Sequence, residues 1–163
     1  MSFPRYPSYV TSGLEWIDTL PEHWRVQSLK RMFRIVNGST PKSEVEAYWD
    51  GDIPWATPAD LSRLDSLYIA DTQRRITLEG LNSCGTTVAP SGAIILSTRA
   101  PIGSLAISAA AMCTNQGCKS LVPSCGVHVK FFAYCLQATS EQLNLRGKGT
   151  TFLELSSAEL GAF

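Results

Sequence analysis

Three short motifs between residues 38 and 103 constrain the fold and function of this chain more than any other feature of its sequence. The first joins GSTP at residues 38–41 to YWDGDIPW at 48–55, the second is TPADL at 57–61, and the third is STRAPIG at 97–103. They are rich in turn-forming residues, and the first carries two tryptophans. None contains a complete set of catalytic groups, so the motifs favour a rigid recognition module over an enzyme.

Short strands separated by turns predict an α+β fold with a single domain, several short helices and long loops. The clearest strand is the apolar run at residues 93–97, and shorter runs at 53–55, 105–107 and 119–122 predict three more. Pro54 would confine its strand to a sheet edge or to a strand start, because proline has no amide hydrogen to donate. The strands are expected to be partly antiparallel.

Helices are predicted by apolar spacing and by capping residues. Apolar side chains at i, i+3, i+4 and i+7 predict a short helix over residues 29–36, and a longer helix is expected over 129–145. Ser43 and Glu46 have the spacing of a capping box, which predicts another short helix at that point. A brief helical turn is expected at residues 77–81.

Charge is balanced overall but unevenly distributed along the chain. The formal net charge is zero, yet residues 35–79 hold eight acidic side chains against four basic ones. Residues 80–140 hold no acid at all, while Arg99, Lys119 and Lys130 are present. Two interpretations stay open: one face of the domain is basic enough to approach phosphates, or this stretch is the buried part of the fold.

The cysteines and the apolar runs bear on metal binding and location. No apolar run is long enough to cross a bilayer, and residues 1–13 lack the apolar core of a signal peptide, so a cytoplasmic location without a membrane partner is expected. Five cysteines then predict reduced thiols. A zinc set is not expected, because its candidates have the unusual spacing C-x4-C-x6-C-x2-H: Cys113, Cys118, Cys125 and His128.

The residues needed for most catalytic sites are absent from the sequence. It contains no G-x-G-x-x-G or Walker-type phosphate loop and no G-x-S-x-G elbow. His23 and His128 are the two imidazoles, and no acidic residue lies two positions before a lysine, as in many nuclease metal sites. Catalytic residues, a bound metal and a resident cofactor are therefore not expected.

Polar residues on two loops are candidates for contacts with nucleic acid. Ser39, Thr40 and Lys42 flank Pro41, whose ring restricts the backbone, so the loop presents hydroxyl and ammonium groups with little loss of freedom. The adjacent pair of Arg74 and Arg75 suits phosphate contacts or a bidentate contact with guanine. A plain connecting loop and two solvated arginines are the alternatives.

Other polar and aromatic residues have a structural interpretation beside a binding one. Trp24 and Trp55 are expected in the core beneath turns, although exposed tryptophans can stack on bases. Arg99 ends the apolar strand and is expected to be held by internal carbonyl groups. Asn115 and Gln116 carry amides suited to adenine in the major groove, or they form a turn before the next strand.

In combination these motifs resemble the target-recognition domain of a type I restriction–modification specificity subunit. The resemblance covers nearly the whole chain and includes, in order, SGLEW, LPEHW, GSTP, YWDGDIPW, STRAPIG, TNQG and GTTF. It implies a non-catalytic component that reads one half-site of duplex DNA and directs methylase and restriction subunits. S-adenosylmethionine, ATP and Mg²⁺ would belong to those partner subunits.

The resemblance also implies a division of the chain and roles for its residues. It implies an N-terminal arm packed on the domain at residues 1–19, a DNA target-recognition domain at 20–155, and the start of a spacer helix at 156–163. Phosphate contacts with DNA would come from Lys42, Arg74, Arg75 and Lys148, assisted by Ser39 and Thr40. Scaffold roles would fall to Trp24, Gly38, Pro41, Trp49, Gly51, Trp55, Arg99, Gly103, Asn115 and Gln116.

Several alternatives remain open on sequence alone. Complete specificity subunits of this family have two recognition domains separated by long helices, whereas the resemblance here covers one. The chain is an isolated domain, a natural truncation, or a half-subunit that pairs with a second half. Two other functions are an enzyme that carries a recognition domain, and an interaction or decoy fragment that binds the methylase without touching DNA.

Overall fold

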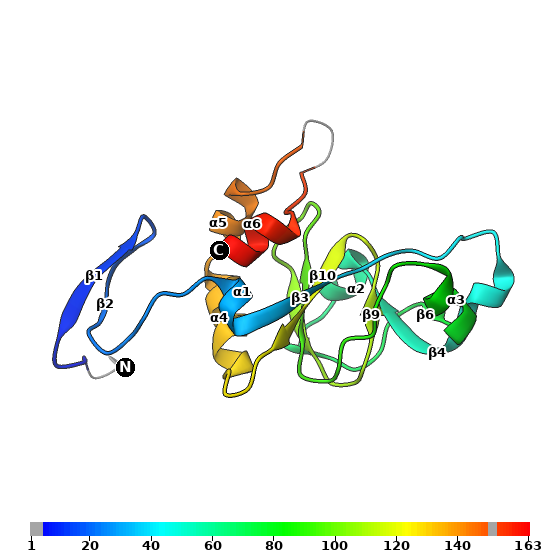
Figure 1. Cartoon of the computed structure of the whole chain (residues 1–163), viewed down its shortest axis with the longest axis horizontal. Coiled ribbons are helices and arrows are strands. Elements are labelled where there is room, and N and C mark those ends of the chain that lie inside the picture. The colour runs from blue at the N-terminus through cyan, green and yellow to red at the C-terminus, as the bar shows by residue number, and fades with distance from the viewer. Residues whose placement is uncertain (1–4, 150–152) are drawn as a thin grey trace.

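Two sheets and an N-terminal hairpin make up the computed structural model, which describes residues 5–149 and 153–163 (Figure 1). The larger sheet has the strand order β3 (Phe33–Asn37), β10 (Cys118–Pro123), β7 (Ile94–Ser97), β8 (Leu105–Ser108) and β5 (Tyr68–Ile69). Its first four strands are antiparallel to their neighbours, and β5 runs parallel to β8. The expected α+β class with partly antiparallel strands is confirmed.

A smaller sheet lies at one end of the molecule (Figure 1). Its central strand is β4 (Trp49–Ala56), which pairs antiparallel with β6 (Arg75–Ile76) and parallel with β9 (Cys113–Thr114). A short 3-10 helix, η1 (Glu46–Tyr48), leads into β4, and α3 (Leu78–Ser83) packs beside it. This sheet carries both tryptophans of the first motif.

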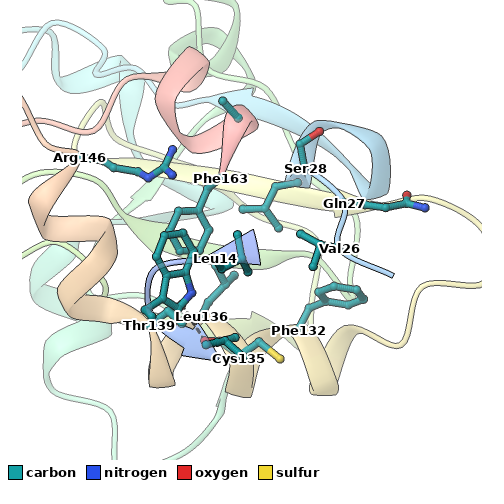
Figure 2. A pocket seen from close by; sticks show the side chains of 14 residues that line it. Leu14, Val26, Gln27, Ser28, Phe132, Cys135, Leu136, Thr139, Arg146 and Phe163 are labelled. Atoms are coloured by element: carbon teal, nitrogen blue, oxygen red, sulfur yellow. Dashed lines mark hydrogen bonds between the residues drawn. The ribbon is translucent and has the colours of Figure 1, made fainter. Parts of the chain in front are cut away.

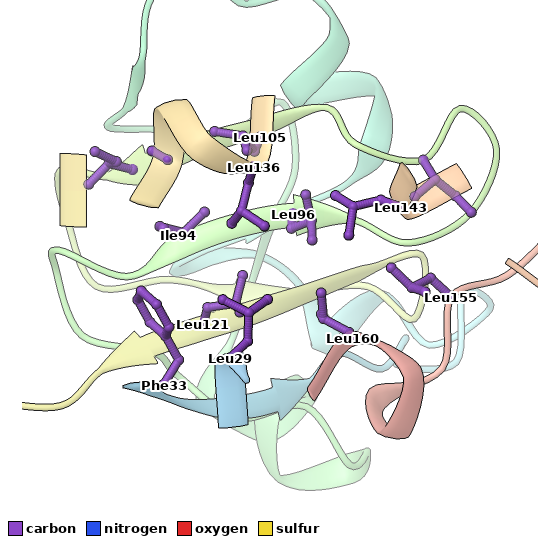
Figure 3. Packing of buried hydrophobic residues seen from close by; sticks show 13 residues of the cluster. Leu29, Phe33, Ile94, Leu96, Leu105, Leu121, Leu136, Leu143, Leu155 and Leu160 are labelled. Carbon is purple, nitrogen blue, oxygen red and sulfur yellow. The ribbon is translucent and has the colours of Figure 1, made fainter. Parts of the chain in front are cut away.

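Side chains of the central strands alternate between the two faces of the larger sheet. Ile94 and Leu96 lie in one hydrophobic cluster, while Ile95 between them lies in another on the opposite face. Because both faces are covered, β7 is apolar from Ile94 to Leu96, as in other doubly buried strands. Figure 3 shows the first cluster, in which Leu121 of β10 packs near the β7 side chains.

Helices cover the sheet on both faces. The first cluster is closed by α1 (Leu29–Met32), α4 (Val129–Ala138), α5 (Ser140–Leu145) and α6 (Ser157–Ala162). Among the buried side chains that these helices contribute are Leu136, Leu143 and Leu160 (Figure 3). On the other face α2 (Pro58–Ser62) contributes Leu61. In the described ranges, no helix has the length and apolar character that crossing a membrane requires.

The helix predicted over residues 29–36 is wrong in its second half. Only the first four residues are helical, in α1, and the chain enters β3 at Phe33. Ile35 and Val36 are β-branched and pair with Leu121 and Ser120 of β10, so strand pairing overrides the helical spacing. The apolar pattern was compatible with both structures because the spacing of Phe33 and Val36 fits one face of a helix, while both residues are buried in β3.

Three other local predictions need correction. Ser43 does not cap a helix, because η1 begins after Val45 and has no side-chain cap. The helix predicted over 129–145 is broken at Thr139 into α4 and α5. Pro54 lies inside the central strand β4, at a point where β4 pairs only with β6, since β9 joins from Trp55 onward. The turn at 77–81 and the strands at 93–97, 105–107 and 119–122 are confirmed.

The N-terminal segment forms a hairpin of β1 (Tyr9–Leu14) and β2 (Ile17–Pro21), so the boundary predicted after residue 19 falls inside β2. The ring of Trp16 at the hairpin turn stacks on Phe163, with centroids 5.4 Å apart. Beside this stack is an apolar pocket of about 220 Å³, to which the hairpin and α4 contribute Leu14 and Phe132 (Figure 2).

Trp24 is not in the core, contrary to the prediction. It is 37% exposed in the segment that follows the hairpin, where its ring packs edge to face with those of Tyr6 and Phe131. Phe131 lies on α4 and is itself exposed, so the indole covers a surface side chain rather than filling the interior.

Candidate nucleic-acid interface

Trp49 and Trp55 of β4 form a buried base for the candidate interface, called here the tryptophan platform. They are 7% and 4% exposed, and their rings meet edge to face with centroids 5.1 Å apart. Ile76 of β6 and Cys113 of β9 complete this cluster. Edge-to-face packing adds to the stability gained from burying the rings, so the platform is a rigid support.

The indole N–H groups of the platform hold the loop at residues 38–42. Trp55 Nε1 donates to the Ser39 carbonyl oxygen at 2.9 Å, and Trp49 Nε1 donates to the Lys42 carbonyl oxygen at 3.1 Å. Pro41 between them is buried, whereas the side chains of Thr40 and Lys42 are exposed. The backbone of the loop is therefore anchored while its polar side chains face solvent.

A second segment, at residues 114–117, lies directly against this loop. Ser39 N donates to the Thr114 carbonyl oxygen at 3.0 Å, and Thr40 Oγ1 donates to Gln116 Oε1. Gly38 is required for this approach, because a Cβ at that position would overlap the Asn115 carbonyl oxygen. The first motif and the TNQG motif thus build one surface.

The two amides of the TNQG motif have different surroundings. Asn115 Oδ1 accepts from Gly117 N at 2.9 Å, which closes a turn before β10. Gln116 is exposed and bonded to Thr40. Of the two interpretations made from the sequence, the turn describes Asn115, and the side chain of Gln116 faces solvent.

The guanidinium of Arg74 lies over the tryptophan platform. Its guanidinium carbon is 3.5 Å from the centroid of the Trp49 ring and 5.8 Å from that of Trp55. The side chain is exposed, and within the described residues it forms no ion pair and no hydrogen bond. Its charge is therefore held in place without being neutralised.

Arg75 points away from the platform, because neighbouring residues of an extended chain face opposite ways. Its Nη2 lies 3.0 Å from Asp71 Oδ1, and its Nη1 donates to the Asp52 carbonyl oxygen at 3.2 Å. The hydrogen bond from Arg75 lowers the pKa of the Asp71 carboxyl below its ordinary value, and Asp71 raises the pKa of Arg75 in turn. The two predicted arginines thus have different surroundings: Arg74 lies over Trp49, and Arg75 is paired with Asp71.

Lys148, the last predicted DNA contact, lies apart from the platform. Its Nζ is 2.6 Å from Glu159 Oε1 of α6, and α6 lies away from α3 and β6 in Figure 1. The hydrogen bond from Lys148 lowers the pKa of the Glu159 carboxyl. The structure therefore brings Ser39, Thr40, Lys42 and Arg74 together, but not Lys148.

The acid-free stretch at residues 80–140 is largely the core, since it contains β7, β8 and β10. Lys119 is 6% exposed and donates from Nζ to Asn37 Oδ1 at 3.0 Å, and burial lowers its pKa. Arg99 was expected to be held by carbonyl groups, but its guanidinium pairs with the Glu154 carboxylate at 3.1 Å. Most of this stretch is therefore the buried part of the fold rather than a basic face that approaches phosphates.

The remaining scaffold glycines lie at close approaches. A Cβ on Gly51 would come within 2.6 Å of the Ile76 carbonyl oxygen, where β4 passes β6. Gly103 has a positive φ of +107° and lies against Ser140 at the start of α5. In the GTTF motif, residues 150–152 lie outside the described residues.

Asp60 is a positioning residue that the sequence analysis did not single out. Its Oδ2 accepts from Thr57 N at 2.9 Å and from Thr57 Oγ1 at 2.6 Å, which forms the capping box of α2. Its Oδ1 accepts from Gln73 N at 2.9 Å, immediately before Arg74. The spacing T-x-x-D in TPADL was the signal that could have revealed it.

The cysteines are all free thiols, as predicted. Cys113 and Cys118 are buried, and burial raises the pKa of Cys113 to about 12 and raises that of Cys118 as well. Cys125 is exposed. Throughout residues 5–149 and 153–163, no three His, Cys, Asp or Glu side chains are grouped to hold a metal ion.

Comparison with known proteins shows that the chain is a DNA specificity domain. The chain belongs to the type I restriction modification DNA specificity domain family, whose family model matches residues 21–163. It is 37% identical over 146 residues to the type I restriction enzyme MjaIX specificity subunit of Methanocaldococcus jannaschii, covering 88% of this chain and 34% of that protein. The EcoprrI specificity subunit of Escherichia coli is 27% identical over 162 residues, covering 93% and 38%.

Solved structures show the same fold. The HsdS subunit from Thermoanaerobacter tengcongensis matches with a TM-score of 0.67 at 23% identity, covering 94% of this chain and 35% of that one. A chain from a study of complex assembly and conformational transition of the type I R-M system matches with a TM-score of 0.69 at 24% identity, covering 95% and 35%. The chain thus spans about a third of the length of the proteins it matches.

Proposed function

We propose that this chain reads the base sequence of one half-site in duplex DNA, as the specificity component of a type I restriction–modification system. The observation that carries the proposal is the grouping of Thr40, Lys42, Arg74 and Gln116, from three separate segments, around the tryptophan platform. These exposed side chains project from a buried, hydrogen-bonded frame. A rigid frame favours sequence recognition because the reading groups are already ordered before DNA binds.

The predicted DNA contacts differ in whether a carboxylate of the protein already holds the side chain. Lys42 contacts phosphate, assisted by Ser39 and Thr40, because an exposed ammonium and hydroxyls suit phosphate oxygens. Arg75 and Lys148 are held by Asp71 and Glu159, so a phosphate would have to displace those carboxylates. The side chain of Lys148 is 79% exposed, and an exposed ion pair of this kind is weak enough to exchange.

The proposal assigns the chemistry of the system to other subunits. This chain is not an enzyme, and methylase and restriction subunits supply the sites for S-adenosylmethionine, ATP and Mg²⁺. The second half of a bipartite target is read by a further recognition domain, either in a longer polypeptide or in a second half-subunit. We place the protein in the cytoplasm, together with its DNA target.

Fluorescence anisotropy with labelled duplex DNA tests the proposal. The chain is mixed with a random-sequence duplex library at low and at near-physiological salt, and bound duplexes are recovered and sequenced. Binding that weakens steeply with salt and enriches a short motif is the expected result. Failure to retain duplex DNA at low salt, or retention without any enriched motif, would contradict direct sequence recognition by this chain.

A protein-binding role without DNA contact is the second candidate, and an exposed aromatic surface favours it. Tyr6, Trp24, Phe131 and Tyr134 are between 37% and 52% exposed, beside the hairpin and α4. Exposed aromatic groups of this kind are common at protein interfaces. Salt-insensitive retention of a methylase subunit by the chain, with no retention of DNA, would favour this role over the first.

A further inference from the structure

We infer that Arg74 is a specificity-determining residue that reads the edge of a guanine base, while its neighbour Arg75 only supports the frame. This inference rests on the proposed function and adds that guanine is the base recognised at one position of the half-site. For Arg74 alone, it selects the guanine contact that the sequence offered for the pair beside phosphate contacts. Four features of the structure lead to it.

The first feature is that Arg74 is fixed at both ends. Its carbonyl oxygen accepts from Trp55 N at 3.2 Å and from Thr72 Oγ1 at 2.6 Å. Its guanidinium lies 3.5 Å from the centroid of the Trp49 ring. An arginine side chain ordinarily loses much rotational freedom when it binds, and this one has already lost part of it.

The second feature is the orientation of the donor groups. A guanidinium carbon 3.5 Å from the Trp49 centroid is at the separation of stacked planes, so the face of the group lies on the ring and its N–H groups stay free around the edge. Within the described residues these N–H groups meet no acceptor. Two parallel N–H groups match the O6 and N7 acceptors that guanine presents in the major groove.

The third feature is the contrast with Arg75. Its guanidinium donates to Asp71 and to the Asp52 carbonyl oxygen, so its fork already has acceptors. Reading a base requires a guanidinium whose position is fixed and whose N–H groups have no acceptor within the described part of the protein. Of these two consecutive arginines, Arg74 has this property and Arg75 does not. Sequence alone assigns them the same role.

The fourth feature is the charge of the surroundings. The exposed Asp50 and Asp52 lie on β4, the strand that carries the platform, and the group around the platform holds two cations, Arg74 and Lys42. Phosphate binding favours clusters of cations, because each neutralised phosphate adds to the affinity. A fixed guanidinium with one lysine in its group, rather than a cluster of cations, suits a base edge better than a phosphate.

The test compares Arg74→Lys with Arg75→Lys, two substitutions that keep the charge and remove the planar fork. Wild type and both variants, each as the full 163-residue chain, are used to select duplexes from the same random library. We expect the wild-type motif to contain a G·C pair that R74K no longer selects. Discrimination at that pair should fall roughly 5- to 150-fold, with the other positions and the salt dependence unchanged. R75K should keep the whole motif.

Two other outcomes would overturn either the inference or the proposed function on which it rests. If R74K binds every sequence more weakly but selects the same motif, Arg74 contacts phosphate or supports the fold, and the inference is wrong. If the wild type selects no motif, the proposed function fails and the inference fails with it. Thermal melting shows whether R74K is folded; if it is not, Arg74→Gln takes its place and should shift the preference at that pair from guanine to adenine.

Discussion

Trp49 and Trp55 act through both their rings and their indole N–H groups. The rings fill the cluster beneath the smaller sheet, and the N–H groups bind carbonyl oxygens of the loop at residues 38–42. A buried indole N–H without an acceptor is unfavourable. The carbonyl oxygens of the loop supply these acceptors, and the same hydrogen bonds hold the loop in place. At the scale of single residues, therefore, two side chains connect the core to the candidate interface.

Lys42→Ala is expected to weaken binding to all duplex sequences alike, because a phosphate contact carries no sequence information. The slope of log K against log salt should fall by about one, since about one fewer counterion is released. Anisotropy titrations at several salt concentrations measure both quantities. Lys130→Ala, an exposed lysine on α4, is the control and should leave the affinity unchanged. A changed sequence preference in K42A would contradict a phosphate contact.

Gly38→Ala is expected to destabilise the protein by about 1–3 kcal/mol, because the new Cβ would overlap the backbone of Asn115. Urea unfolding followed by circular dichroism measures the change. Gly85→Ala is the matched control, since a Cβ at Gly85 has open space and its φ is not positive. Its unfolding free energy should stay within about 0.5 kcal/mol of the wild type. Equal stability of the two variants would argue against the close approach of loop and turn.

At the scale of elements, α2 connects the larger sheet to the segment that ends in Arg74. It is only five residues long, which is too short for a helix to be stable by its hydrogen bonds alone. Leu61 anchors it in the core, and the Thr57–Asp60 capping box closes its first turn. Because Asp60 also binds Gln73 N, the position of Arg74 depends on this cap.

Asp60→Ala removes acceptors from three donors and is expected to destabilise the protein by about 2–4 kcal/mol. Thermal and urea unfolding measure the loss. Asp65→Ala is the control, because this exposed carboxylate forms no hydrogen bond within the described residues, and its effect should stay below about 0.5 kcal/mol. DNA affinity of D60A, measured below its unfolding transition, should also fall, since Arg74 loses support. A D60A variant as stable as D65A would refute the role of the cap.

At the scale of the whole molecule, the hairpin of β1 and β2 is attached differently from the rest. Its hydrogen bonds are mainly internal, and its turn reaches the C-terminal end through the Trp16–Phe163 stack. The guanidinium of Arg146 lies near both rings, 5.8 Å and 5.1 Å from their centroids. An element held by so few contacts is expected to open without unfolding the sheets.

Trp16→Ala should therefore raise amide hydrogen exchange in β1 and β2 while leaving β7 and β10 protected. Loss of an aromatic pair worth about 1 kcal/mol corresponds to roughly fivefold faster exchange. Exchange followed by mass spectrometry resolves the two regions. Tyr134→Ala removes an exposed aromatic side chain from α4 and should leave exchange in the hairpin unchanged. Faster exchange throughout W16A would show that the hairpin is part of the main cooperative unit.

Local sequence patterns correctly predicted those elements in which the apolar residues of the pattern are the ones that the fold buries. The run at residues 93–97 was recognisable as a strand because it is apolar on both faces, and β7 is buried on both. The pattern at residues 29–36 misled because the spacing of Phe33 and Val36 fits a helix, whereas pairing with β10 makes a strand. Trp24 was misplaced for a related reason: proximity to a turn does not reveal which side of the chain the core lies on.

By itself, the sequence determined the α+β class, most of the strands and the family, because turn residues and apolar runs act over short distances along the chain. Only the tertiary structure decided which charged side chains are free. Arg74 and Arg75 are adjacent and chemically identical, but one stacks on Trp49 and the other binds Asp71. Thr40 meets Gln116 across 76 positions of sequence. Such pairings depend on the folded backbone, and no local pattern encodes them.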